Sequence, residues 1–201
     1  MGMCLVLQTL SDANISKVLQ DPPLIWKVVA PDDSGAYERA RKGEALGFLG
    51  RLLGKANTKK APILELSLDE GEVAETDLDK AWHGIHFLLT QTAWEGEAPL
   101  NFLLAGGAEA GDIDLGHGTG RALLSNEVAA IASALEAINE STLRERFSPD
   151  QMMRLEIYPE IWDRPLDEDD SLAYCLEYFE VLRSFVSDAA LRNVGIIIYV
   201  T

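Results

Sequence analysis

The sequence predicts a single-domain α+β fold, in which a small sheet is packed by several amphipathic helices. A short β-prone run at residues 3–9 and a continuously apolar run at residues 194–200, near the two ends of the chain, are typical of strands. Between them, apolar residues recur at three- and four-residue spacing, as in amphipathic helices. A chain of 201 residues is long enough for one substantial domain. The terminal strands are expected to pair with each other, because their backbone groups need partners that helices cannot supply.

The first half of the chain contains three helix signals. Ser11 is a candidate N-cap for a short helix that ends at Pro22. Residues 45–54 could form a basic amphipathic helix, weakened by three glycines. A third helix is predicted to open at Thr76, with a wide apolar face. That face consists of Leu78, Ala81, Trp82, Ile85, Leu88 and Leu89.

The second half predicts one further strand and three helical segments. Residues 121–124 suit a short buried strand, and Ser125 suits the cap of the helix that follows. Ser148 and Pro149 indicate the start of a short helical turn. Acids at residues 167–170 precede the last helix, where the positive end of the helix dipole favours them.

The net charge of −16 is unevenly distributed along the sequence. Residues 39–60 contain seven basic residues and one acid, a local net charge of +6, which leaves −22 for the rest of the chain. The acidic body disfavours nucleic acid as a partner and favours a basic protein or a polyamine, although solvation of the surface alone is the commoner reason for such an excess. We expect the basic segment, at about residues 35–60, to fold over the domain like a lid.

Cellular location follows from the two cysteines and from missing targeting signals. Cys4 and Cys175 lie in apolar patterns and are interpreted as buried free thiols. The sequence has no signal-peptide pattern and no run of 18 apolar residues. We therefore expect a cytoplasmic protein that does not bind membranes.

All three histidines lie within 35 residues, at His83, His86 and His117. His83 and His86 are about one helical turn apart and could share a metal ion, with His117 as a third ligand. A carboxylate at the spacing of known zinc motifs is missing, and a hydrogen-bonded core histidine explains His86 equally well. We therefore predict no bound metal and no cofactor.

The segment from Gly116 to Arg121 resembles a phosphate-binding loop in composition alone. It lacks the Lys-Ser/Thr end of the P-loop, and no helix follows directly as a dinucleotide fingerprint requires. Arg121 could hold an anion in a bidentate fork, but an ion pair with one of the many carboxylates is the favoured interpretation.

Tyr158 and Trp162 concentrate aromatic side chains beside Pro159. Loop tryptophans are enriched at binding surfaces, although they also fill gaps between a helix and a sheet. The sequence shows no nucleophile elbow and no cysteine in an electropositive setting near a histidine.

Four segments of the chain resemble the YfbM-like family, a bacterial group of small domains of unknown function. They are the opening Met1-Gly2-Met3, residues 78–90, residues 116–128 and the Ile157-Tyr158-Pro159 turn before Trp162. The resemblance covers nearly the whole chain, and the segment of residues 78–90 is its most specific part. His117 and Thr119 stand where such domains often have tyrosine and proline, which argues against a catalytic role for His117. The resemblance implies a compact α+β fold with a small sheet, but no established activity and no catalytic residues.

Two functional hypotheses follow from these patterns. The favoured one is a non-catalytic bacterial interaction protein, such as an immunity-type partner that neutralises a basic protein or toxin, with Trp162 as an anchor at the interface. The alternative is an enzyme that binds a small molecule or anion, with a site around His83, His86, His117 and Arg121.

Overall fold

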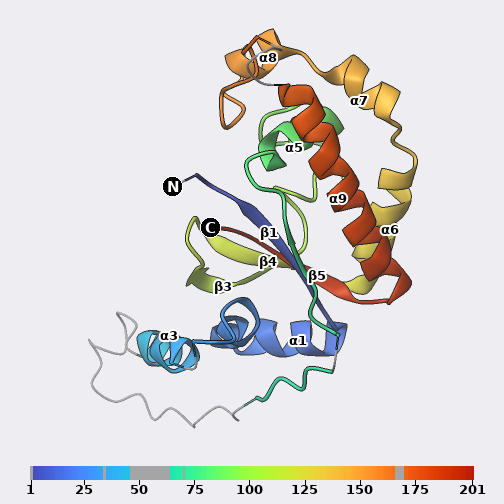
Figure 1. Ribbon diagram of the computed structural model, residues 1–201. Coiled ribbons are helices and arrows are strands. Elements are labelled where there is room, and N and C mark those ends of the chain that lie inside the picture. The colour runs from blue at the N-terminus through green and yellow to red at the C-terminus, as the bar shows by residue number, and fades with distance from the viewer. Residues whose placement is uncertain (1, 34, 46–63, 70, 166–169) are drawn as a thin grey trace.

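A five-stranded antiparallel sheet forms the centre of the molecule in the computed structural model (Figure 1), which describes residues 2–33, 35–45, 64–69, 71–165 and 170–201. The strands follow the order β2-β1-β5-β4-β3 across the sheet. Their bounds are Leu5–Leu10 for β1, Glu75–Asp77 for β2, Ala108–Asp114 for β3, Thr119–Leu123 for β4 and Gly195–Val200 for β5. The terminal strands β1 and β5 pair in register from Leu5↔Val200 to Leu10↔Gly195, which confirms the predicted pairing.

Helices cover both faces of this sheet (Figure 1). One face packs against α5 (Trp82–Thr90), α6 (Ser125–Glu136) and α9 (Ser171–Leu191). The other face packs against α1 (Asp12–Gln20) and the short 3-10 helix η1 (Pro22–Ile25), which leads into α2 (Trp26–Val29) and α3 (Ala36–Ala45). Successive β5 residues belong to opposite core clusters, Ile196 and Ile198 to one and Ile197 to the other. This explains why β5 is continuously apolar in sequence.

Ser11 and Asp170 cap α1 and α9 with their own side chains, whereas the cap predicted at Ser125 was wrong, because Leu124 is the N-cap of α6 and Ser125 is its first residue. The Ser11 side chain caps α1 by accepting a hydrogen bond from the Asn14 N–H at 3.4 Å. The Asp170 carboxylate caps α9 by accepting from the Ala173 N–H at 2.9 Å. The predicted short helical turn is α8 (Pro149–Arg154). Of the helix expected at residues 45–54, residues 46–54 lie outside the described residues, as does much of the basic segment.

The helix predicted to open at Thr76 begins instead at Trp82, so that boundary was wrong. Thr76 belongs to β2, where it pairs with Leu7 of β1. A β-branched residue suits an edge strand, and pairing there satisfies backbone groups of β1 that a helix would have left open. Strand β3 and helix α7 (Glu140–Arg146) were also missed.

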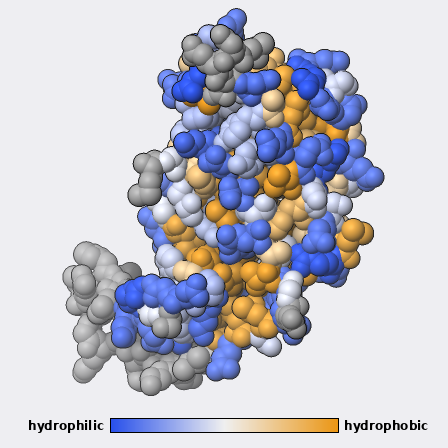
Figure 2. Space-filling view, viewed as in Figure 1, coloured by the Kyte–Doolittle hydropathy of each residue, from blue (hydrophilic) through white to orange (hydrophobic). Residues whose placement is uncertain are grey.

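The apolar stripes of α6 and α9 pack together as expected, with Val128, Ile131 and Leu135 of α6 and Phe179 and Leu182 of α9 buried. Figure 2 shows mostly hydrophilic residues on the viewed side, with apolar residues gathered near α1 and toward the C-terminal end of α9. Leu191, at that end, is 85% exposed. Among the described helices, none has the length and apolar character needed to cross a membrane.

Candidate functional site

His83 lies on α5 and is fully buried. Its Nδ1 accepts a hydrogen bond from the Tyr158 N–H at 3.0 Å, so Nε2 carries the proton and donates to the Ala93 carbonyl at 2.7 Å. Burial lowers the pKa of His83, which keeps the ring neutral. Both ring nitrogens are therefore engaged in joining α5 to two neighbouring loops.

Two tryptophan rings pack against the ring of His83. The Trp82 ring stacks on it at 4.9 Å between centroids, and the Trp94 ring lies 4.4 Å away at a tilt of 42°. The Tyr158 ring stacks on Trp82 at 5.8 Å. Trp82 is buried, as its place on the apolar face predicted, whereas Trp94 is 60% exposed and was not singled out from the sequence. The group of rings shields His83 from water.

His86 is also fully buried, but neither of its ring nitrogens has a hydrogen-bond partner in the described part of the chain. Burial, followed by the nearby His83, lowers the pKa of His86 to about 4; the backbone of Glu95 opposes this shift, and Arg121 adds the smallest contribution to it. The centroids of the His83 and His86 rings are 6.4 Å apart. The described residues contain no group of three or more His, Cys, Asp or Glu side chains placed to hold a metal ion.

His117 is exposed at the tip of the β3–β4 hairpin, unlike the buried pair on α5. Its N–H donates to the Val200 carbonyl at 3.1 Å. The Asp114 carboxylate accepts hydrogen bonds from the N–H groups of Gly116 and Gly118, which hold the pKa of Asp114 below its usual value. Both glycines have positive φ, a conformation that explains their use here. The glycine segment therefore builds a tight hairpin turn.

Arg121 projects from β4 and donates four hydrogen bonds to backbone carbonyls. The acceptors are Phe102, Leu103, Ala105 and Gly106, at 2.6–3.0 Å. These carbonyl groups lie at the end of a turn, where no helical N–H among the described residues donates to them. The guanidinium of Arg121 supplies the missing donors, and its positive charge is favourable beside the carbonyl oxygens. The two interpretations from the sequence were an anion clamp and a carboxylate pair; the structure instead commits both terminal guanidinium nitrogens to this turn.

Tyr158 and Trp162 belong to the turn that follows α8, and both face inward. The Tyr158 hydroxyl accepts a hydrogen bond from the Met3 N–H at 2.9 Å. Trp162 is 2% exposed, donates to the Ile157 carbonyl at 2.6 Å and packs beside Gly84 and Cys175. The expectation that Trp162 anchors a partner at the surface is therefore wrong, because the side chain fills the space between α5 and α9.

Neither cysteine is set up as a nucleophile. Cys175 is buried in the core, and burial raises the pKa of its thiol. Cys4 is only half-buried, a departure from the sequence prediction, and its Sγ donates to Asp79 Oδ1 at 3.4 Å. Burial and the Asp79 carboxylate raise the pKa of Cys4. Both thiols are thus protonated at neutral pH and weakly reactive.

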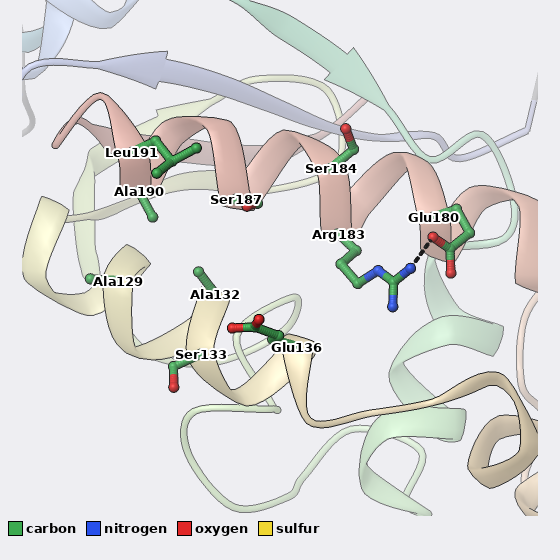
Figure 3. Close-up of a pocket in the computed structure, with 10 residues that line it drawn as sticks. All are labelled: Ala129, Ala132, Ser133, Glu136, Glu180, Arg183, Ser184, Ser187, Ala190 and Leu191. Atoms are coloured by element: carbon green, nitrogen blue, oxygen red, sulfur yellow. Dashed lines mark hydrogen bonds and ion pairs between the residues drawn. The ribbon is translucent and has the colours of Figure 1, made fainter.

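A shallow groove of about 770 Å³ runs between α6 and α9. Figure 3 shows Ala132 of α6 pointing toward α9, where Ser187 and Ala190 line the groove. At one end, Arg183 forms an ion pair with Glu180 at 2.5 Å. The groove has no histidine or cysteine among its lining residues, so it offers a shape but no activated group.

Two tyrosines and three carboxylates meet where the start of α9 passes β2. We call this set, Asp77, Asp79, Tyr174, Glu177 and Tyr178, the tyrosine–carboxylate patch. The two rings lie edge to face with centroids 5.0 Å apart. Asp77 and Glu177 are exposed, and the other three are partly exposed. Sequence reasoning missed the patch, although the four-residue spacing of the tyrosines with an acid between them was a visible signal.

Sequence and fold comparisons place this chain among known domains. A family model described as "Domain of unknown function (DUF1877)" matches residues 1–199. The chain belongs to this family. The structure of YfbM, a protein of unknown function from Escherichia coli, is similar with a TM-score of 0.63, 18% identity, and coverage of 98% of this chain and 99% of that chain. No curated protein sequence matches.

Membership of the DUF1877 family confirms the resemblance seen in the sequence, and the similarity to YfbM confirms the fold alone. Residue roles must therefore come from the geometry. In the described part of this family member, His83 and Arg121 are engaged within the fold and the thiols are protonated. The tyrosine–carboxylate patch, by contrast, is accessible from solvent.

Proposed function

We propose that this protein is a non-catalytic interaction protein of the bacterial cytoplasm that binds a basic partner, as an immunity-type protein neutralises a toxin. The observation that supports it most directly is the net charge of −16. Such a charge produces a long-range negative field that attracts cationic proteins and speeds their association.

The internal use of the candidate catalytic groups supports the same proposal. The alternative, an enzyme with His83, His86, His117 and Arg121 in one site, requires these groups to be available to a substrate. Arg121 would have to give up four hydrogen bonds, and His83 two. His117 is exposed on a hairpin, whereas His83 and His86 are fully buried.

The test uses the full chain as bait in its native host, followed by kinetics with each purified partner. We expect a basic protein to be recovered at low salt, with an association rate that falls as salt rises and a dissociation rate that changes less. The physical reason is that the screening length falls from about 30 Å at 0.01 M to about 8 Å at 0.15 M salt.

One pair of results would overturn the proposal in favour of the enzyme. It is the recovery of no basic partner at low salt, together with ligand-dependent thermal stabilisation of the chain by a phosphorylated metabolite.

A further inference from the structure

We propose that the tyrosine–carboxylate patch is the surface that receives an arginine or lysine side chain of the basic partner. This inference rests on the proposed function and gives it a location. The patch brings together β2, the turn after it and the first turns of α9, which are in contact in the fold.

The Asp79 carboxylate is held in place by two hydrogen bonds, and the backbone of Asp79 makes a third. Its Oδ2 accepts from the Tyr174 hydroxyl at 2.9 Å, and its Oδ1 accepts from Cys4 Sγ at 3.4 Å. Its own N–H donates to Asp77 Oδ1 at 2.9 Å, which holds the two acids together. Each carboxylate oxygen can accept about two hydrogen bonds, so Asp79 retains capacity for an incoming donor.

The two rings supply the second recognition element. Tyr174 uses its hydroxyl fully in the fold, since it donates to Asp79 and accepts from the Lys80 N–H at 3.1 Å. The Tyr178 hydroxyl has no hydrogen-bond partner among the described residues, and its ring is partly exposed. Burial and then Asp79, Asp77 and Glu177 raise the pKa of Tyr178, which reports a negative potential at its hydroxyl. A cation over such a ring gains from both the carboxylates and the π face.

The arrangement favours an extended organic cation over a metal ion. No described group of three carboxylate, thiol or imidazole side chains is compact enough to coordinate a metal. A guanidinium, by contrast, presents five donors in a plane and can reach several separated acceptors while stacking on a ring. An ammonium can also bind here, but as a point charge it uses fewer of these contacts.

Lys80 is a positively charged neighbour of the patch, so changing it tests whether the charge of the patch determines binding. Its side chain lies over Gly2, where a Cβ would come within 2.4 Å of Lys80 Cε. Its charge lowers the pKa of Cys4, so it acts on the same local field. Replacing Lys80 by an uncharged residue should therefore strengthen binding of a cationic partner.

The test is an NMR titration of the full chain with a synthetic peptide of alternating arginine and glycine, and with a glutamate–glycine peptide as the probe of opposite charge. We expect the arginine peptide alone to shift the signals of Tyr174, Glu177 and Tyr178. Tyr178→Ala should weaken its affinity about tenfold, Tyr178→Phe should retain most of it, and Lys80→Gln should strengthen it severalfold.

Glu145→Gln is the matched control, since Glu145 is an exposed acid on α7 outside the patch. If Glu145→Gln weakens binding as much as Glu177→Gln, the peptide senses only the overall charge and the inference is wrong. The NMR signals of Tyr178→Ala away from the patch show whether that variant is folded, and Tyr178→Phe, which keeps the aromatic packing, tests the hydroxyl alone.

The native partner separates this inference from the proposed function. A basic partner that binds the Tyr178→Ala and Glu177→Gln variants as tightly as the wild type would overturn the patch and leave the proposed function intact. If the bait recovers no basic partner, the proposed function fails, and the peptide titration still decides whether the patch binds cations.

Discussion

His83 and His86 are three residues apart on α5 and equally buried, yet their chemical environments differ. His83 exchanges hydrogen bonds with two backbone groups, so its burial is compensated. His86 lacks such partners among the described residues and lies near both His83 and Arg121, so a proton on its ring is strongly disfavoured. At the residue scale, His83 joins neighbouring segments through its hydrogen bonds, and His86, whose pKa falls to about 4, is the larger source of acid sensitivity of the two.

The pH dependence of stability tests this assignment of His86. Its pKa falls from 6.5 in the unfolded chain to about 4 in the fold, so the unfolded state binds a proton first. Stability is therefore complete above pH 6.5 and is lost as the pH falls toward 4. We expect a loss of about 2 kcal/mol between pH 7 and pH 5 in urea unfolding experiments.

His86→Leu is the control, and it should reduce this slope whatever its own stability, with the remainder due to His83, whose pKa burial also lowers. Burial acts to raise the pKa of the Glu72 carboxylate, but hydrogen bonds from Ser11 and Asn14 lower it to about 2. The stability that Glu72 contributes is therefore present above pH 4.5 and is lost only as the pH falls below that value. An unchanged slope in His86→Leu would show that another group causes the acid sensitivity.

At the scale of elements, close packing between α5 and α9 depends on a residue without a side chain. A Cβ on Gly84 would lie 2.4 Å from the Trp162 ring and 2.8 Å from Cys175 Sγ. Trp162 therefore reaches the core from the turn after α8 because α5 leaves room for it. The same contact explains why the aromatic loop residue is not at the surface.

Gly84→Ala tests the packing of α5 against Trp162. In an exposed helix this change would stabilise by about 1 kcal/mol, but here the overpacking should destabilise the fold by about 1–3 kcal/mol. The free energy of unfolding from urea titration measures the difference. In a Trp162→Phe background the cost should shrink, because the two changes share one contact. A stabilised Gly84→Ala variant would contradict the tight packing.

At the scale of the whole molecule, the dominant physical property is the negative charge. With a net charge of −16, like charges repel across the folded surface. The same negative field that attracts a basic partner therefore lowers the free energy of unfolding of the isolated protein. Binding a cationic partner relieves that repulsion, so stability and function are linked through one property.

Salt should stabilise the free protein because it screens this self-repulsion. Between 0.01 M and 0.5 M sodium chloride we expect the melting temperature to rise by a few degrees, equivalent to about 1–2 kcal/mol. Calorimetry at pH 7.5 measures the change, with sucrose at matched osmolality as the uncharged reference. A melting temperature that falls with salt would show that attractive ion pairs outweigh the repulsion.

The sequence by itself determined the elements whose signals are local. The β-prone run at the start of the chain and the continuously apolar run at its end predicted the paired terminal strands, and the periodic stripes predicted the buried faces of α6 and α9. Capping by Ser11 could also be predicted from the sequence, because it depends only on the Ser11 side chain and on the backbone N–H of Asn14, three residues later.

Tertiary structure alone decided the features that depend on contacts between distant residues. Thr76 became a strand residue because β1 lies beside it, and Trp162 became a core residue because Gly84 leaves a space. The patch joins Asp79 to Tyr174 across 95 residues, a pairing that local spacing does not encode. Periodicity specifies which face of an element is buried, whereas the side chains that meet across two elements depend on how those elements pack.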